Sequence, residues 1–351
     1  MVGIPHCSAW VLACFLAGLL SLPGSSAAQD VYDNTWTFSV HFENDLFADT
    51  DQNYTSGVKL SWVSPDLTRF RDNEKLPEWI YPYIEALPFI NEPDRERNVA
   101  ISFGQNIITP QDTERSDLIT DDRPYAGWLY LGLGFHSKTE SQLDTMEIQL
   151  GVVGELSLAR QTQILVHELR GFSTPKGWQH QLENEPGVNL IYERNWRHQL
   201  VGGDRGLGID VIPHLGAAVG NIYTYANLGL EVRAGWNLPR DFGSSTIRPG
   251  GDTNDPVARS DPRRAEDTGF GLHLFAFGDG RAVARDIFLD GNTFADSHSV
   301  DKETFVADVA IGAALIYGRF KLSYAKVLRT REFVGQPSKH RFGSITLSYT
   351  F

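Results

Sequence analysis

Apolar and polar residues alternate one by one along most of the chain, which is the period of a β-strand. Residues 36–43 read Trp-Thr-Phe-Ser-Val-His-Phe-Glu. In an extended strand the apolar side chains of this segment point to one side and the polar ones to the other. A membrane-spanning strand turns the apolar side to lipid and the polar side to the barrel interior. The segment is therefore predicted to be the first strand of a barrel.

Eleven further segments have a similar pattern, and the last of them ends in Phe351. They lie at about 55–63, 97–107, 125–137, 144–154, 188–200, 208–219, 222–237, 269–285, 303–317, 319–328 and 342–351. The total of about twelve is even, as is typical of bacterial outer-membrane barrels. After the N-terminal region no apolar run reaches 18 residues, so strands must make any membrane crossing, and strands can cross only as a closed barrel. The predicted fold is an all-β, transmembrane, antiparallel β-barrel; a soluble β-sandwich or small lipocalin-like barrel is the alternative.

The N-terminal region has the pattern of a secretory signal. An apolar run at residues 8–22 is followed by small residues at 25–28. The run is shorter than the ~20 residues of a spanning helix, which favours a signal peptide over a membrane anchor. We predict a signal peptide at 1–28 and the barrel at 29–351. Both cysteines, Cys7 and Cys14, fall in the signal, so the mature barrel would have no disulfide.

The strand count also predicts which connections face the cell exterior. If the first strand starts in the periplasm, the connections after odd-numbered strands face outward, and these include about 44–54, 108–124 and 155–187. Two inward connections, about 64–96 and 238–268, are longer than usual periplasmic turns; the first contains a possible short helix near 78–87. We expect aromatic girdles at both membrane interfaces. The candidate girdle residues are Trp128, Tyr130, Tyr192, Trp196, Tyr223, Tyr225 and Trp236.

The formal charge of −13 narrows the range of partners. Nucleic-acid-binding proteins need clustered Lys and Arg to neutralise phosphates, so no nucleic-acid partner is expected. Acidic exterior loops suit a divalent cation instead, or a surface on which such cations bridge anionic lipids.

The exterior connection after the fifth strand contains a predicted helix at 155–171. Ser157 is a plausible N-cap and Gly171 a C-terminal stop. One apolar face is formed by Leu158, Leu165 and Leu169.

Gln163 and His167 are four residues apart in this helix and share another face. A neutral histidine accepts a proton near neutral pH, so His167 is a candidate general base. The alternative is a histidine with a structural role only.

The first exterior loop, 43–55, is dense in hard oxygen donors that suit Ca²⁺. Its residues 49–53 start like an EF-hand loop, but Tyr54 stands where glycine is needed and Leu60 where a bidentate glutamate would sit. A calcium site made by a few of these oxygens and backbone carbonyls, or an ordinary polar loop, remain the two possibilities.

Motifs of the common hydrolases are missing from the sequence. It has no G-x-S-x-G elbow and no H-E-x-x-H, so a typical serine hydrolase or zinc protease is not supported. The segment 297–299, Ser-His-Ser, is the nearest approach to a serine site.

Four segments taken together resemble one family. They are Phe-Glu-Asn-Asp at 42–45, Asn-Tyr-Thr-Ser-Gly at 53–57, Asp-Arg-Pro-Tyr-Ala-Gly-Trp at 122–128, and the Gln163 to His167 helix. In order and spacing they resemble the outer-membrane lipid A 3′-O-deacylases (LpxR type), and the resemblance covers most of the mature chain.

The resemblance implies a monomeric twelve-stranded barrel in the bacterial outer membrane that removes the 3′-linked acyloxyacyl group of lipid A, the anchor of lipopolysaccharide, with calcium as cofactor. Its site residues would be Asn44, Thr55, Gln163 and His167, with Asp45 at the metal and His167 activating water. No nucleophilic serine would be needed.

One feature departs from a lipid A site. Lipid A phosphates are expected to need Lys or Arg, yet the loop 108–121 offers only Arg115 among its acidic residues. Two other readings compete with the deacylase. One is an outer-membrane phospholipase, which needs a serine nucleophile; the other is a non-enzymatic porin or structural barrel.

Overall fold

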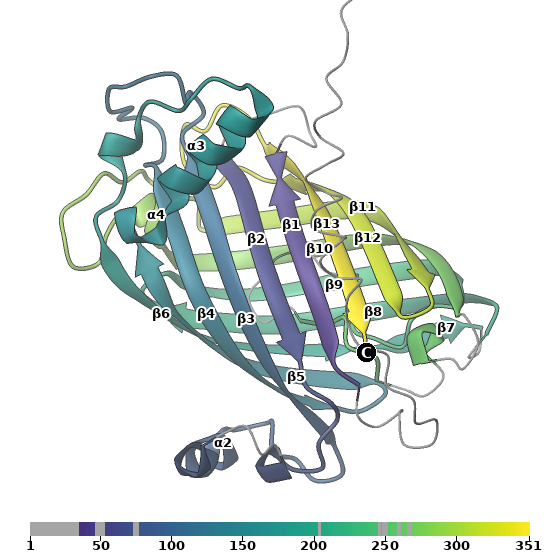
Figure 1. Cartoon of the computed structure of the whole chain (residues 1–351). Helices are drawn as coiled ribbons and strands as arrows, with labels where there is room; N and C mark the ends of the chain where they lie inside the picture. The colour runs from purple at the N-terminus through teal and green to yellow at the C-terminus, as the bar shows by residue number, and fades with distance from the viewer. Residues whose placement is uncertain are drawn as a thin grey trace, which may run out of the picture.

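The computed structural model describes residues 35–45, 53–72, 77–202, 205–244, 247, 252–257, 261–264 and 269–351, so the predicted signal at 1–28 lies outside the described residues. One antiparallel sheet winds into a closed barrel (Figure 1). Its strands are β1 (Thr37–Asn44), β2 (Asn53–Val63), β3 (Glu96–Thr109), β4 (Ala126–Lys138), β5 (Gln142–Val153), β6 (Glu185–Trp196), β7 (His198–Val201), β8 (Leu207–Gly220), β9 (Tyr223–Trp236), β10 (Phe270–Asp286), β11 (Phe305–Tyr317), β12 (Phe320–Arg329) and β13 (His340–Thr350).

The thirteen assigned strands make a barrel of twelve. β6 and β7 both pair with β8 and are two parts of one barrel strand, interrupted only at Arg197. Each barrel strand pairs with its neighbours in sequence, and β1 pairs with β13 to close the ring. The twelve predicted strands are therefore confirmed, most of them to within two or three residues at each end.

The helices lie at the two ends of the barrel. α3 (Ala159–Arg170) and α4 (Ile287–Asp290) lie at one end, and α2 (Tyr81–Ala86) and the C-terminal end of the chain lie at the other (Figure 1). By the strand count these are the exterior and periplasmic ends. The predicted short helix near 78–87 is confirmed as the 3-10 turn η3 (Glu78–Ile80) followed by α2. None of the helices in the described ranges has the length and apolar character of a membrane span.

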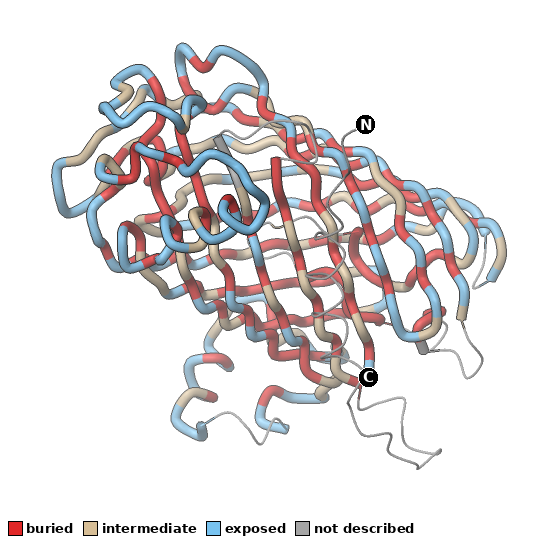
Figure 2. Tube along the Cα trace, turned by 45° about the horizontal axis from the view of Figure 1, so that its top comes forward, coloured by how far each residue is buried: buried red, intermediate tan, exposed pale blue. Residues whose placement is uncertain are grey.

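Buried and exposed residues alternate along the strands, as Figure 2 shows. In β1 the polar side chains are buried in the interior, while the apolar ones are partly exposed on the outer face. The predicted apolar-out, polar-in pattern is confirmed.

Four of the seven predicted girdle residues face the interior instead. Trp128 and Tyr130 are buried in β4 with stacked rings, 5.6 Å between centroids, and Tyr223 and Tyr225 line an interior cavity. Their positions in the alternation put them on the inward side of their strands. Trp236 faces outward at the periplasmic end of β9, and Tyr192 and Trp196 lie half-buried on the outward side of β6.

The periplasmic connection between β9 and β10 folds into the barrel. Asp241 is fully buried, and its carboxylate accepts hydrogen bonds from Arg233 of β9 at 2.5 Å, Lys321 of β12 at 2.7 Å and Arg263 at 2.9 Å. Burial alone would raise the pKa of Asp241, but the three cations hold it well below its usual value. The carboxylate is therefore ionised at neutral pH and pairs with cations from different strands.

Two further acids of the same connection reach the opposite side of the ring. Asp252 accepts a hydrogen bond from Ser61 at 2.9 Å and lies 3.7 Å from the Lys59 ammonium, both on β2. Asp255 pairs with Lys138 of β4. The described residues of this connection thus form a plug, which we define as 239–244, 252–257 and 261–263, held inside the barrel by buried ion pairs.

The plug predicts a large loss of stability in Asp241→Asn. The variant leaves Arg233, Arg263 and Lys321 buried without their shared carboxylate, and breaking such a buried pair costs about 3–5 kcal/mol. We expect a lower thermal unfolding midpoint, measured by the heat-dependent shift in electrophoretic mobility, and current through planar bilayers that the wild type does not pass. Asp117→Asn, which breaks an exposed pair with Arg115, is the control and should change neither. An unchanged midpoint in Asp241→Asn would contradict the plug.

Candidate active site on the outer wall

The helix of the exterior connection begins at Ala159, four residues after the predicted start at 155 and one residue later than an N-cap at Ser157 would give. Ser157 is not its N-cap: it lies in a 3-10 turn, and Leu158 caps α3 in the left-handed conformation with φ of 59°. The Ser157 hydroxyl instead donates to the Gly154 carbonyl at 2.6 Å. Gly171 ends the helix with φ of 70°, as predicted.

The two faces of α3 are reversed relative to a helix of a water-soluble protein. The residues buried against the barrel are Ala159, Gln163 and His167. The leucine face points away from the wall, with Leu165 and Leu169 56% and 64% exposed. A helix with polar groups toward the protein and leucines outward suits a surface in contact with lipid.

Gly127 of β4 lets α3 lie directly on the outer wall. A Cβ at this glycine would come within 2.1 Å of the Ser157 hydroxyl oxygen and 2.3 Å of the Ala159 Cβ. Ala159 also packs against Ile107 of β3, in a small cluster with Tyr125 and Trp178. The glycine of the 122–128 segment is therefore needed for close helix packing.

His167 is buried and held in one tautomer by the backbone. Its Nδ1 lies 2.7 Å from the Ser173 carbonyl oxygen, which can only accept, so Nδ1 carries the proton. The basic lone pair is then on Nε2. Ser173 is itself fixed, because its hydroxyl donates to Glu114 at 3.2 Å. A histidine oriented this way can act as a base through Nε2.

Gln163 is oriented by a residue that sequence reasoning missed. The buried indole N–H of Trp178 donates to Gln163 Oε1 at 2.8 Å, which leaves the amide NH₂ facing the other way. Among the described residues this buried Nε2 has no hydrogen-bond partner. Because buried polar groups are rarely left unsatisfied, the amide is a donor available to a ligand. Trp178 lies in a segment without a periodic pattern, so nothing in the sequence indicated that it contacts Gln163.

Asn44 and Asp45 lie at the exterior end of β1. Asn44 is on the outward side, since Glu43 faces the interior, and both Asn44 and Asp45 are buried. The backbone of Thr55 belongs to β2, but its side chain lies outside the described residues. Thr55 falls at a shift of register between the pairs Tyr54 with Ile108 and Ser56 with Ile107. Such bulges are common beside active sites, where they redirect a side chain.

The register places the β1 end and the helix on the same part of the wall. Asn44 pairs with Ser56, Ser56 with Ile107, and Ile107 with Gly127. This row spans three strand spacings, about 14 Å. From Ala159, at Gly127, to His167 the helix rises about 12 Å. α3 packs on β3 and β4 and crosses the exterior ends of the strands in Figure 1. The helix from Ala159 to His167 is therefore nearly as long as the row from Gly127 to Asn44.

The predicted calcium loop is only partly described. Residues 46–52 lie outside the described residues, and in the remainder no three His, Cys, Asp or Glu side chains cluster as a metal centre. Asp45 begins the loop with a fully buried carboxylate. A buried, hard, anionic oxygen donor of this kind fits Ca²⁺.

Arg123 of the 122–128 segment has a structural role. Its guanidinium donates to Glu332 at 2.8 Å and lies 5.2 Å from the Phe333 ring centroid, so it ties two exterior loops together. The residues considered as a serine site are also used within the loops. His298 Nε2 lies 2.7 Å from the Asp122 carbonyl oxygen, and the Ser297 hydroxyl accepts the Asn292 N–H.

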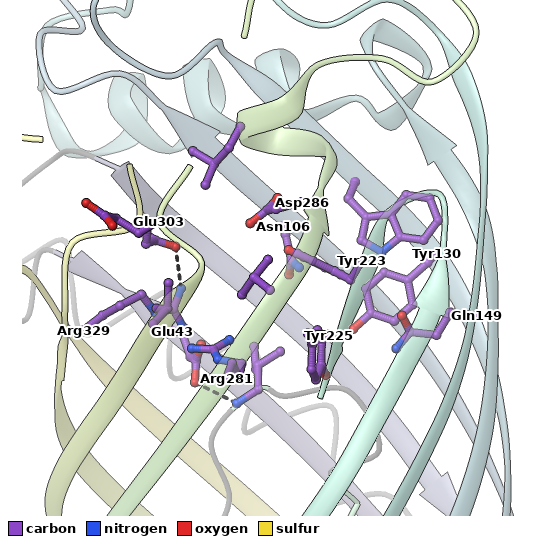
Figure 3. Close-up of a pocket in the computed structure, with 16 residues that line it drawn as sticks. Glu43, Asn106, Tyr130, Gln149, Tyr223, Tyr225, Arg281, Asp286, Glu303 and Arg329 are labelled. Atoms are coloured by element: carbon purple, nitrogen blue, oxygen red, sulfur yellow. Dashed lines mark hydrogen bonds and ion pairs between the residues drawn. The ribbon is translucent and has the colours of Figure 1, made fainter. Parts of the chain in front are cut away.

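An interior cavity of about 90 Å³ lies on the other side of the wall (Figure 3). Arg281 and Arg329, which line it, both pair with Asp308, at 2.5 and 2.7 Å, and Glu43 accepts the Ile247 N–H at 2.7 Å. The barrel wall separates this cavity from α3, which packs on β3 and β4 on the outer face.

Comparisons with known proteins agree with this architecture. The sequence model of the family described as "Outer membrane protein LpxR" matches residues 11–351. LpxR from Salmonella typhimurium has a similar structure, with a TM-score of 0.71 and 18% identity, over 90% of this chain and 100% of that one. The β domain of the Bordetella autotransporter BrkA, at a TM-score of 0.41 and 7% identity over 91% and 99% of the two chains, is far less similar. No curated protein matches at a significant level.

The close contact at Gly127 predicts that Gly127→Leu displaces α3 without unfolding the barrel. Its side chain would collide with Ser157 and Ala159, so limited proteolysis should cut the connection 154–184 faster than in the wild type while heat-modifiable mobility is retained. Gly278→Ala is the matched control, because nothing lies within 4 Å of its added Cβ. Equal cleavage rates in all three proteins would show that α3 does not rest on this glycine.

Proposed function

Because the chain belongs to the LpxR family of outer-membrane proteins, we propose that it is a lipid A 3′-O-deacylase. In this proposal it acts as a monomer and uses calcium to hydrolyse the ester of the 3′-linked acyloxyacyl group in the outer leaflet. The observation that carries the proposal is the reversed helix α3. This helix buries its own Gln163 and His167 against the outer wall and turns its leucines toward the surrounding lipid.

The location of these residues selects the class of substrate. They lie on the outer face of the barrel at its exterior end, where an outer-leaflet lipid can reach them sideways from the membrane. Lipid A occupies that leaflet. Its acyl chains would lie along the outward leucines while the ester enters between α3 and the wall.

His167 would serve as the general base. With Nδ1–H held by the Ser173 carbonyl, Nε2 takes a proton from water. The water oxygen bonds to the ester carbonyl carbon, and the bond from that carbon to the sugar oxygen then breaks. The imidazolium returns its proton to the leaving sugar oxygen. The products are the free fatty acid and a 3′-hydroxyl, and no serine nucleophile is used.

Gln163 would stabilise the negative charge that develops on the carbonyl oxygen. The Trp178 indole fixes Gln163 Oε1, so the Nε2 donor is held in place before substrate arrives, as catalysis by charge stabilisation requires. We assign Asn44 and Thr55 to the same site, because Asn44 pairs with Ser56, the neighbour of Thr55, in the row of residues that ends at Gly127 beside the start of α3.

Calcium is assigned to Asp45 and to oxygens of the following loop. When bound, the cation would polarise the ester carbonyl. Asp45 is fully buried and stands directly before that loop. The acidic loop 110–125, in which Arg115 pairs with Asp117, offers little positive charge to phosphates, so we expect the ester rather than the phosphates to dominate recognition.

The two competing functions have less support. A phospholipase would need a serine nucleophile, and Ser297 and His298 are engaged in loop contacts. A porin would need an open lumen, whereas the plug fills the interior with paired charges.

His167→Gln is expected to lower deacylation by about 10²–10⁴-fold, the usual contribution of a general base. The readout is mass spectrometry of lipid A from cells expressing either protein, with loss of the 3′-acyloxyacyl mass only for the wild type. His198→Gln, an exposed histidine on β7, is the control and should keep full activity. Unmodified lipid A with properly inserted wild-type protein would instead favour the phospholipase or porin functions.

Chelation of calcium is expected to abolish activity, and Asp45→Asn to weaken calcium binding. Removing the formal charge of a calcium ligand lowers affinity. Isothermal titration of the purified protein with CaCl₂ measures binding independently of activity, with Asp112→Asn, an exposed acid of a neighbouring loop, as the control. Equal affinities in the two variants would remove Asp45 from the metal site.

A further inference from the structure

The long periplasmic connection between β2 and β3, residues 64–95, extends below the barrel wall (Figure 1). Its described residues form a 3-10 turn η2 (Phe70–Asp72), the turn η3 and helix α2. Unlike the plug, it packs on the outside of the barrel. Its buried apolar side chains cover outward residues of β3, β4 and β5. The members of this cluster are Phe70, Tyr81, Ile84, Ile90, Val99, Phe135 and Met146.

Polar contacts hold the connection against the same strands. The Arg97 guanidinium of β3 donates to three carbonyl oxygens of the connection, those of Thr68 at 2.5 Å, Glu92 at 2.7 Å and Arg95 at 2.8 Å. Arg95 pairs with Asp144 on β5 at 2.7 Å. The connection therefore has a defined position on the wall.

The opposite side of the connection is aromatic and exposed. Trp79 and Tyr83 are each 69% exposed and four residues apart, and Phe89 is 53% exposed. Phe89 has φ of 70°, which is costly for a residue with a Cβ. Its ring lies 5.3 Å from that of Tyr192 on β6.

The barrel itself presents an incomplete aromatic girdle at its periplasmic end. Outward aromatic side chains occur near the periplasmic ends of most strands. They are Phe38, Trp62, Trp196, Trp236, Phe270, Tyr317, Phe320 and Tyr349. At the corresponding ends of β3, β4 and β5 the outward positions are Arg97, Val99, Phe135, Asp144 and Met146, which the connection covers.

We propose that the connection 64–95 completes this girdle. Trp79, Tyr83 and Phe89 take the place of lipid-exposed aromatic residues on β3 to β5, where the connection covers the outward Phe135, and insert into the headgroup region of the phospholipids of the inner leaflet. Trp and Tyr are enriched at membrane interfaces because one end of the side chain is apolar and the other polar.

Two observations favour lipid over a soluble protein partner. The aromatic surface is continuous with the lipid-facing wall above it, where Ile101, Leu131 and Leu150 are exposed. In addition, exposed charges of the connection pair with each other, Arg71 with Glu85 and Arg69 with Asp72. These two pairs neutralise four of the charges that the connection exposes, which leaves Glu78 and Asp94 as the exposed acids among its described residues.

Site-directed spin labelling tests the proposal on the full chain. Both cysteines, Cys7 and Cys14, fall in the predicted signal, so one introduced cysteine gives the mature chain a single label. Tyr83→Cys reports on the connection, Leu131→Cys on the lipid-facing wall and Phe294→Cys on a water-exposed exterior loop. Each protein is reconstituted in bilayers of phosphatidylethanolamine and phosphatidylglycerol alone, and its relaxation by oxygen and by a water-soluble nickel chelate is measured.

We expect the oxygen-to-nickel accessibility ratio at position 83 to lie between those at 131 and 294, the position of an interfacial group. A ratio equal to that at 294 would overturn the proposal. A label exposed to nickel in pure lipid and protected only in native outer-membrane fragments would overturn it too, because a periplasmic macromolecule would then be the partner. Retained heat-modifiable mobility shows that each variant is folded. A loss of deacylase activity at His167→Gln has no bearing on these outcomes, so the two proposals can fail separately.

Discussion

Closure of the sheet between β1 and β13 is the constraint on which the other features depend. Backbone N–H and C=O groups find no partners in lipid, so a spanning sheet cannot have free edges. A closed ring has two distinct surfaces, and the alternation of side chains assigns each residue to one of them. The interior then needs polar groups, which the plug supplies. The lipid-facing surface needs apolar side chains, except where another element covers a polar site.

α3 is such a cover. A polar pair on the outer wall would be exposed to lipid at a high cost in desolvation unless another element lies over it. The helix supplies both the pair and the cover: Gln163 and His167 face the wall, and the leucines face away. Close packing at Gly127 and the aromatic contact of Tyr125 with Trp178, 4.9 Å between ring centroids, fix this cover in place.

The sequence predicted the strands well, because a period of two is a local signal that tertiary packing does not override in a barrel. It predicted the helix and its stop at Gly171, but not its start, since the left-handed Leu158 has no signature. Trp128 and Tyr130 were assigned to a girdle by residue type, although the alternation of side chains along β4 places both of them inside the barrel. The role of Trp178 and the ion pairs of Asp241 could not be predicted, because both join segments distant in sequence without periodic pattern.

The plug also acts as a brace across the seam of the barrel. Its Asp252 lies beside Lys59 of β2, and its Asp241 pairs with Lys321 of β12. In the ring, β13 and β1 lie between these two strands, and their pairing closes the sheet. The ion pairs of the plug therefore join the two sides of the seam from within, so that the first and last strands are held together by interior contacts as well as by their own hydrogen bonds.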